Sequence, residues 1–401
     1  MGFIGMGKQN NGLLNNFIGQ EIQAVAVCEV DTNRRKNAEK IVNQKHKNSD
    51  CQAFVDYREI TEDKNIDAVC IATPDHWHSV ITISALKNGK DVYCEKPLTH
   101  NIHESVEVIK AVKKYNRILQ TGSMQRSSSE FRIACELVRN GVIGKIKNVG
   151  IAVGDPGRPC DLQEESPELG LNWDLWCGPA PMRAYSSVLS PRGIHNHFPA
   201  WRNYMEYGGG MVTDWGAHHI DIAQWGLGTD DSGPVQARPP EDWKKWKSKR
   251  GAKLVYSNGT TITHQSGFGV HFQGEDGDVK VNRGRFVFSL KGKEIAKFEK
   301  RGDGSLGSAL QTAEKTFLNN AKVKLYKSNH HIRDFLSSVE SRKKPITNEI
   351  VGGRSAICCH LMNQTYYNGE VIKWDPKTNT LSEQTGKPEW LTRDYRGIWK
   401  V

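Results

Sequence analysis

The stretch from Gly208 to Trp225 holds residues whose spacing suits acid–base chemistry. It opens with three glycines and continues with apolar residues at helical spacing. Asp214, His218 and Asp221 are separated by four and three positions, so a helix would place them on one face. A carboxylate one turn from an imidazole can fix its tautomer and raise its proton affinity. We therefore expect Asp214 and His218 to handle an alcohol proton while a hydride leaves the same carbon.

Other interpretations of this stretch remain open on spacing alone. An aspartate that caps a helix and a histidine on its surface would give the same pattern. Asp221 is as well suited to a structural role as to a place in the site. The elements around the stretch have to decide between these interpretations.

The first thirty residues have the order of a dinucleotide site. Residues 2–7 read as a short strand that runs into a glycine turn with Gly5 and Gly7, a helix follows, and a strand over 24–28 ends at Glu29. The glycines would allow close approach of a pyrophosphate at the helix N-terminus, and the acid would accept hydrogen bonds from a ribose. An acid here favours NAD, with NADP less suited, although Asp31 and Arg34 leave that choice open. Asn10 stands where a third glycine is expected.

Strands and helices then alternate up to about residue 122. Strands are expected over 68–72, 91–94 and 118–121, with helices over 33–44, 77–88 and 102–115. This alternation predicts a parallel, doubly wound sheet, which binds ligands at the carboxyl ends of its strands. The polar clusters at those ends give the candidate cofactor contacts: Gly5, Gly7, Lys8, Gln9, Glu29, Asp31, Thr73, Pro74, His76, His78, Glu95 and Lys96.

The pattern changes after residue 122, and we place a domain boundary there, with domains over 1–122 and 123–401. A helix is expected over 128–140, strands over 146–153, 253–257, 260–265, 279–285 and 286–290, and helices over 330–341 and 350–367. The turn Asn258-Gly259 is a strong hairpin signal. These runs predict an α+β domain with a large open, mostly antiparallel sheet. Its uncovered face favours a homo-oligomer, dimer or tetramer. Residues 301–327 are expected to be irregular, and 374–401 to be loop and extended chain.

Composition limits the classes of function. The net charge of +10 comes from scattered basic residues without a recognition motif, so we expect no nucleic-acid partner. No apolar run is long enough for a membrane span. Nine cysteines show neither a disulfide framework nor metal spacing, and paired histidines such as His195 and His197 lack a third ligand at metal spacing, so we expect no metal. These features favour a cytoplasmic protein. The very short first strand leaves a periplasmic one possible if an export signal precedes it in the gene.

Several motifs together resemble the Gfo/Idh/MocA oxidoreductases, the superfamily of glucose–fructose oxidoreductase and inositol 2-dehydrogenase. The motifs are the glycine turn, Thr73-Pro74-Asp75-His76, Glu95-Lys96-Pro97, residues 122–126, Gly141-x-x-Gly144 and the 208–225 stretch. The resemblance implies a Rossmann domain followed by an α/β domain with an open sheet. It also implies that Lys96 lies between nicotinamide and substrate and lowers the pKa of the reacting hydroxyl. His218 would be the general acid/base, with Asp214 as its neighbour or a substrate ligand.

Aromatic and polar residues outside these motifs are candidates for substrate contacts. They would suit a sugar or cyclitol, although the tryptophans could equally fill the domain interface. We expect an NAD-dependent dehydrogenase of a sugar, glycoside or cyclitol. The alternatives are a redox-neutral glycosidase, lyase or epimerase with tightly bound NAD, and a dinucleotide sensor without catalysis. The candidate substrate contacts are Arg126, Trp173, His195, Asn196, Trp201, Arg202, Asp214 and His218.

Overall fold

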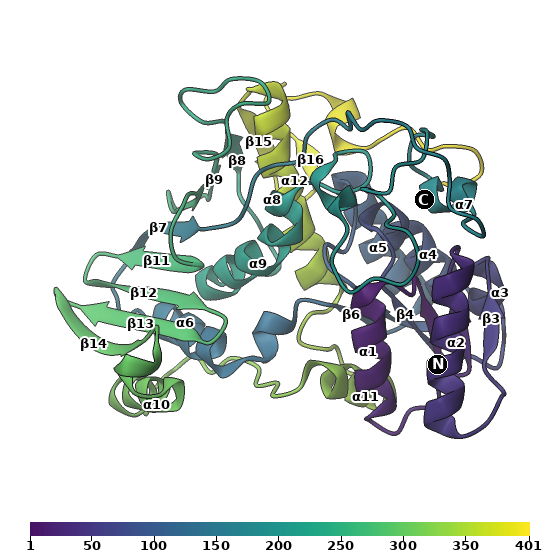
Figure 1. Ribbon diagram of the computed structural model, residues 1–401. Coiled ribbons are helices and arrows are strands. Elements are labelled where there is room, and N and C mark those ends of the chain that lie inside the picture. Colours follow the sequence, from purple (N-terminus) through teal and green to yellow (C-terminus); the bar gives the residue numbers. More distant parts are fainter.

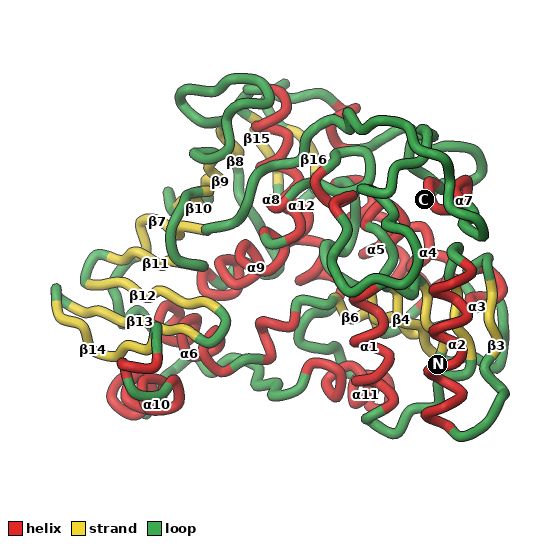
Figure 2. Tube along the Cα trace, in the orientation of Figure 1, coloured by secondary structure: helices red, strands yellow, loops and turns green.

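The computed structural model describes residues 1–401 and contains two β-sheets with their helices (Figures 1 and 2). The first is a six-stranded parallel sheet in the order β3-β2-β1-β4-β5-β6. This is the doubly wound sheet that the alternation predicts. Its strands are β1 (Gly2–Ile4), β2 (Ala26–Cys28), β3 (Gln52–Phe54), β4 (Ala68–Ile71), β5 (Asp91–Cys94) and β6 (Leu119–Thr121).

Helices cover both faces of the parallel sheet, because its strands are apolar on both sides. One face packs against α1 (Lys8–Ile18), α2 (Thr32–His46) and α11 (His331–Ser341), with Phe17 and Phe335 against Tyr93. The other face packs against α3 (Arg58–Thr61), α4 (Asp75–Lys87) and α5 (Ile102–Tyr115). Asn101 caps α5 by accepting a hydrogen bond from the backbone N–H of Glu104.

The second sheet has ten strands and is mostly antiparallel, as expected, with one parallel pairing between β10 and β7. Asn258-Gly259 forms the turn between β9 and β10. In sheet order the strands are β14 (Lys293–Phe298), β13 (Arg285–Leu290), β12 (Gly277–Asn282), β11 (Val270–Gly274), β7 (Ile146–Ile151), β10 (Thr261–His264), β9 (Lys253–Val255), β8 (Gln236–Arg238), β15 (Ile372–Asp375) and β16 (Thr380–Leu381).

Helices cover one face of the large sheet and build the larger core. They are α6 (Ser129–Arg139), α9 (Gly216–Leu227), α10 (Leu306–Phe317) and α12 (Glu349–Asn368). The short helices α7 (Trp173–Cys177) and α8 (Met211–Asp214) lie in the long connection between β7 and α9. Short 3₁₀ turns complete the chain at Met124–Ser127, Ala200–Asn203, Arg301–Asp303 and Pro388–Leu391.

Helix α10 corrects the expectation that residues 301–327 are irregular. Ser305 caps it, and Leu310 and Ala313 lie buried one turn apart against β13 and β14. The many polar residues of the segment hid this narrow apolar stripe. Strands β3, β8, β11, β14 and β15 were also missed. They have three to six residues each, and tertiary pairing rather than residue preference decides such strands.

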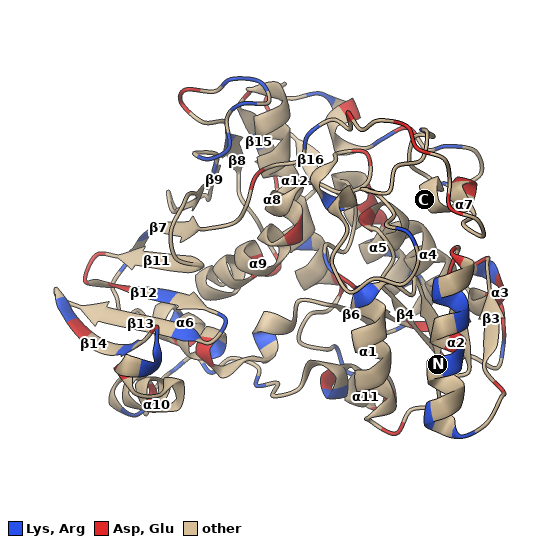
Figure 3. Cartoon of the chain, in the orientation of Figure 1, with Lys and Arg blue, Asp and Glu red and all other residues tan.

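The later part of the chain returns to the parallel sheet. Helix α11 lies on one of its faces, and Trp399 packs at 5.0 Å from Trp77 in the core of the other face. The core of the parallel sheet thus contains residues from both ends of the chain. The domain boundary at residue 122 therefore stays a prediction. No helix is both long and apolar enough to cross a bilayer. Acidic and basic residues are interspersed along the chain, with basic residues prominent along α2 (Figure 3).

Candidate active site

The glycine turn after β1 is shaped for close approach of a ligand. Gly5 has φ +80°, and a Cβ there would lie 2.7–2.8 Å from atoms of Thr73, including its backbone. Gly7 precedes α1, and a Cβ there would meet nothing within 4 Å. Asn10 takes the third glycine position because its buried amide donates to the carbonyl of Ile4 at 3.1 Å. The turn fits a pyrophosphate at the N-terminus of an eleven-residue helix.

Glu29 lies at the end of β2 and lines the pocket that begins at this turn. Its Oε2 accepts from the backbone N–H of Met6 at 2.7 Å, and its Oε1 accepts from that of Asp31 at 3.0 Å. Burial raises the pKa of this carboxyl. Asp31 itself is fully buried and caps α2 through the N–H of Arg34 at 2.8 Å. Its Oδ2 is buried without a hydrogen-bond partner, so the expected role of Asp31 at the cofactor stays a prediction.

A segment over residues 189–202 closes this pocket from the side of the second domain. Ser190, His195 and Phe198 line the pocket opposite the glycine turn. Arg34 donates from Nε to the carbonyl of Gly193 at 3.1 Å and also bonds Ser190 and Pro191. Lys8 donates to the carbonyl of Asn196 at 3.1 Å and lies 4.6 Å from the ring of Phe198. The pocket is therefore built from both parts of the chain.

Four expected cofactor contacts follow β4, and the structure separates them into two pairs. Thr73 and Pro74 line the pocket. His76 and His78 are buried, and their ring nitrogens face backbone carbonyls, those of Trp176 and Tyr207 for His76 and those of Pro97 and Thr73 for His78. This corrects the expectation that the two imidazoles contact the cofactor. They instead hold neighbouring segments in place.

Lys96, the lysine of the Glu-Lys-Pro motif, follows the carboxyl end of β5. Its Nζ lies 2.5 Å from Oδ1 of Asp214, and Nε of Arg202 lies 3.6 Å from Oδ2 of the same carboxylate. Glu95 beside it accepts from the amide of Gln9 at 2.9 Å. Burial alone would raise the pKa of Asp214, but Lys96 and Arg202 outweigh it and hold that pKa below its usual value. A cation and its counterion thus meet where the two parts of the chain join.

His218 lies one turn beyond Asp214, and its environment corrects the expected Asp–His pair. Asp214 bonds Lys96 and not the imidazole, because the helix breaks between α8 and α9 at Trp215. His218 is buried, with an Nδ1 that has no hydrogen-bond partner. Burial, with the nearby charges of Lys96 and Arg283, lowers its pKa well below the usual value. The imidazole is therefore held neutral, opposite to the effect expected from a neighbouring carboxylate.

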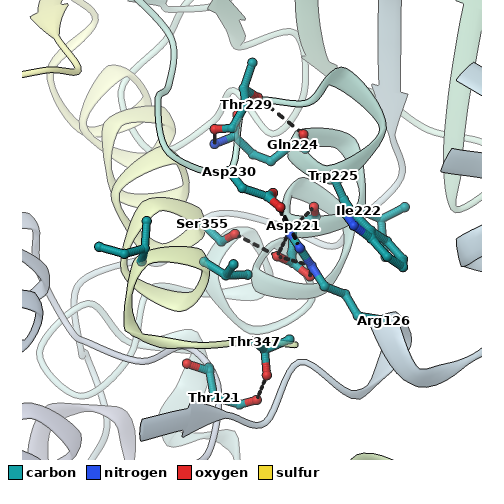
Figure 4. Close-up of polar contacts among 12 residues, drawn as sticks. Thr121, Arg126, Asp221, Ile222, Gln224, Trp225, Thr229, Asp230, Thr347 and Ser355 are labelled. Atoms are coloured by element: carbon teal, nitrogen blue, oxygen red, sulfur yellow. Dashed lines mark hydrogen bonds and ion pairs between the residues drawn. The ribbon is translucent and has the colours of Figure 1, made fainter. Parts of the chain in front are cut away.

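Arg126 was expected to reach the substrate, and its place corrects that expectation (Figure 4). Its guanidinium is 2 % exposed and bonds Asp221, which is fully buried, at 2.8 Å, and Asp230 at 2.7 Å. Ser355 donates to the same Asp221 carboxylate at 3.0 Å. These groups bond one another, so the cluster joins the 3₁₀ turn after β6 to α9 and α12, and the guanidinium does not line the cofactor pocket. Asp221 thus has the structural role.

The aromatic candidates lie in different places. Trp173 stacks on Trp176 with centroids 4.5 Å apart and donates to the carbonyl of Arg183 at 2.7 Å, so it fills the interior of the connection rather than the pocket. Trp201 and His195 line the pocket. Arg202 lies 4.5 Å from the ring of Trp201. Asn196 is exposed and contributes its backbone carbonyl.

Two residues near Lys96 were not among the sequence candidates. Asp75 is 3 % exposed at the start of α4, and burial together with the charge of Asp214 raises its pKa well above the usual value. The sequence signal that could have identified Asp75 is its position within the Thr73–His76 motif. Arg283 reaches the site from the turn between β12 and β13, and its guanidinium lies 4.6 Å from the ring of Trp215. Nothing in the local sequence marks that residue.

Comparison with known families agrees with this geometry. Residues 1–123 match the "Oxidoreductase family, NAD-binding Rossmann fold", and residues 159–401 match the "Oxidoreductase family, C-terminal alpha/beta domain". The chain belongs to the Gfo/Idh/MocA oxidoreductase family. Membership confirms the resemblance inferred from the motifs and the fold class.

Curated Gfo/Idh/MocA relatives match over a limited length. Myo-inositol 2-dehydrogenase of Thermotoga maritima is 38% identical over 108 residues, which is 27% of this chain and 32% of the relative. Levoglucosan dehydrogenase of Pseudarthrobacter phenanthrenivorans is 37% identical over 91 residues, 23% of each chain. The matched stretches therefore span about a third or less of these relatives.

Solved structures match over nearly the whole fold. Aldose-aldose oxidoreductase from Caulobacter crescentus, complexed with glycerol, has a TM-score of 0.61 at 17% identity and covers 93% of this chain and 99% of that one. Levoglucosan dehydrogenase in complex with NADH and levoglucosan has a TM-score of 0.58 at 16% identity and covers 93% and 98%. At this identity the likeness concerns the fold.

Proposed function

We propose that this protein oxidises a secondary alcohol of a sugar, glycoside or cyclitol and transfers the hydride to NAD. The observation that carries the proposal is the contact between Lys96 and Asp214 at 2.5 Å. It joins a lysine at the carboxyl edge of the Rossmann sheet to the segment that bears His218. The names of the relatives, which are inositol and levoglucosan dehydrogenases, support the same substrate class.

The cofactor proposal depends on the glycine turn and Glu29. When bound, a nicotinamide dinucleotide would supply the hydride acceptor. The residues proposed to hold it are Gly5, Gly7, Lys8, Gln9, Glu29, Thr73 and Pro74, all of which line the pocket. A buried carboxyl at the end of β2 leaves no favourable place for a 2′-phosphate, so we propose NAD rather than NADP.

The chain's own residues would bind the substrate and accept the proton of its hydroxyl. Lys96, paired with Asp214, would donate a hydrogen bond to the reacting hydroxyl and lower the pKa of that hydroxyl. His218 is held neutral, so it can accept the hydroxyl proton, and its depressed pKa lets it release that proton readily. Because Nδ1 is enclosed without a partner, we assign the proton exchange to Nε2. Arg202 and Trp201 are the remaining proposed substrate contacts.

A panel of sugars and cyclitols tests this proposal. With NAD, one or more of them should give a rise in NADH absorbance. Lys96→Ala and His218→Ala should each lower kcat by roughly 10²- to 10⁴-fold while NADH binding, followed by fluorescence, is kept. Full activity in the Lys96→Ala variant would reject the proposal, and so would tight NAD binding without any turnover.

The segment over residues 189–202 favours a second candidate function. It closes the cofactor pocket and is tied down by Arg34 and Lys8, which lie on the opposite wall. A cofactor enclosed in this way would be reused rather than exchanged. Redox-neutral chemistry through a transient keto-sugar, in a glycosidase, lyase or epimerase, needs such retention. NAD that survives dialysis, together with product but no net NADH, would favour this candidate over net oxidation.

Assembly into a homo-oligomer is part of the proposal. The face of the large sheet away from its helices carries side chains that bond one another, for example Asn148 with Gln273 at 2.7 Å and with Thr261 at 2.8 Å. Such an ordered face offers a surface for pairing with a second copy. Light scattering behind size exclusion should give the mass of a dimer or tetramer, and a mass of 45.0 kDa would contradict this.

A further inference from the structure

The turn between β12 and β13 brings an arginine toward the proposed site. Arg283 is followed by Gly284, whose N–H donates to Oε1 of Glu130 at 3.2 Å at the start of α6. With the Gln125 amide turned to satisfy both partners, its nitrogen donates to the carbonyl of His218 and its oxygen accepts from Nε of Arg283, each at 3.3 Å. In Figure 1 this turn lies at the end of the large sheet nearer the Rossmann domain. The turn is therefore held in place on both sides.

The guanidinium of Arg283 is positioned but has no anionic partner. It lies over the ring of Trp215, which follows Asp214 directly, at 4.6 Å. No carboxylate lies within ion-pair distance of it, and its two terminal nitrogens form no hydrogen bond. The residue is exposed, so a ligand can reach it. A planar guanidinium with two free terminal nitrogens is the geometry that binds a carboxylate through two parallel hydrogen bonds.

The charges around Arg283 show a surplus of one cation. Lys96, Arg202 and Arg283 are positive, whereas Asp214 and Glu95 are negative. Asp75 is counted as neutral, because burial and the charge of Asp214 raise its pKa well above the usual value. Lys96 and Arg202 both contact Asp214, whereas Arg283 interacts with Glu95 and Asp214 only at a distance, which leaves Arg283 as the cation without a counterion in contact. A single negative charge on the substrate would balance the group. A phosphate dianion would instead leave an excess of negative charge next to Glu95 and Asp214.

We propose that Arg283 binds a carboxylate of the substrate, so that the protein selects sugar acids over the corresponding neutral sugars. The inference rests on the proposed function and names its substrate class. Trp215 would provide the flat surface beside which the sugar ring lies, and Arg283 would fix the end of the ring that carries the acid. The hydroxyl to be oxidised would then face Lys96 and His218. Arg283 is thus a specificity-determining residue.

Matched pairs of ligands test the inference. Glucuronate is compared with glucose, galacturonate with galactose, and gluconate with glucitol, with glucose 6-phosphate as a dianionic probe. Binding to the enzyme with NADH is followed by cofactor fluorescence, and oxidation by NADH formation. In the unaltered protein at least one acid should bind about 10- to 100-fold more tightly than its neutral partner, as expected for a charge-assisted contact. Arg283→Gln should abolish that preference and leave the affinity for the neutral sugar within about threefold.

Arg285→Gln is the control, because Arg285 lies two residues away and stacks on Phe268 at 4.5 Å instead of Trp215. It should keep the preference for acids. Equal affinity for acids and neutral sugars in every pair would overturn the inference, as would an equal loss for both ligands in Arg283→Gln. Preference for glucose 6-phosphate over every carboxylate would also overturn it. Acid binding that depends on Arg283 without any Lys96-dependent oxidation would refute the proposed function and leave the inference standing.

Discussion

Replacing Arg126 with methionine separates a structural role from a role in substrate binding. Arg126 is 2 % exposed and its partner Asp221 is fully buried. Methionine has a similar length but leaves the carboxylate of Asp221 without its counterion. Breaking a buried pair by removing one partner costs about 3 to 5 kcal/mol. The second partner, Asp230, adds less to this cost, because its side chain is 32 % exposed and can be hydrated once the ion pair is lost.

The expected shift in melting temperature follows from chain length. An unfolding entropy of about 2.1 cal/mol/K per residue gives about 0.8 kcal/mol/K for 401 residues unfolding as one unit. A loss of 3 to 5 kcal/mol then lowers Tm by about 4 to 6 °C, measured by scanning calorimetry. Adding Asp221→Asn should recover part of the loss, since the uncompensated charge is removed. KM for the substrate should stay within about twofold.

The matched control is Arg158→Met, which breaks an exposed pair with Asp161 at 3.1 Å. Exposed pairs contribute about 0 to 1 kcal/mol, so Tm should move by about 1 °C or less. An unchanged Tm in Arg126→Met together with a strongly raised KM would refute the structural account of Arg126. A direct contact with the substrate would give that result.

Three further outcomes follow from the site and the core. Gly5→Ala should weaken NADH binding measured by fluorescence and destabilise the protein by about 1 kcal/mol or more, because its Cβ meets Thr73; unchanged binding would argue against the proposed turn. Asp214→Asn should lower kcat by roughly 10²-fold with NADH binding kept, since Lys96 loses its counterion; a normal kcat would contradict that role. Burial lowers the pKa values of His264, His331 and His360 from 6.5 to about 4, so their stabilising effect is complete above about pH 6.5 and is lost as pH falls toward 4. Each should contribute about 1.4 kcal/mol per pH unit to the slope of the unfolding free energy in denaturant titrations between these values, alongside the buried His76, His78 and His219, and a flat profile would show that burial does not lower the pKa values of these histidines.

The carboxyl edge of the parallel sheet could be predicted from the sequence because local patterns determine it. Apolar runs alternating with amphipathic segments fix a doubly wound sheet, and Glu29 and Lys96 follow directly after two of its strands. Asp214 could be placed near Lys96 only through the family resemblance. Its pairing with the lysine rather than with His218 depends on how the two parts of the chain meet, which spacing along one helix does not report.

The expectations that were wrong or missing for Arg126, Arg283 and α10 share a physical cause. Arg126 and Arg283 are both arginines near polar neighbours in the sequence, but one is enclosed by Asp221 and the other lies open at a turn. Burial and partner choice are tertiary properties, so residue type alone could not separate them. Helix α10 was missed for a similar reason, since a narrow apolar stripe on a polar segment becomes visible only once β13 and β14 lie beneath it.

The position of helix α11 determines which residues a recombinant nucleotide-binding fragment must contain. Ile332 and Phe335 complete the same apolar cluster as Phe17 and Tyr93, although about 240 to 320 positions separate them along the chain. A fragment that stops at residue 122 would leave those rings in contact with water and should aggregate. A recombinant nucleotide-binding half would have to carry residues 331–341 as well, joined by a linker or supplied as a separate peptide.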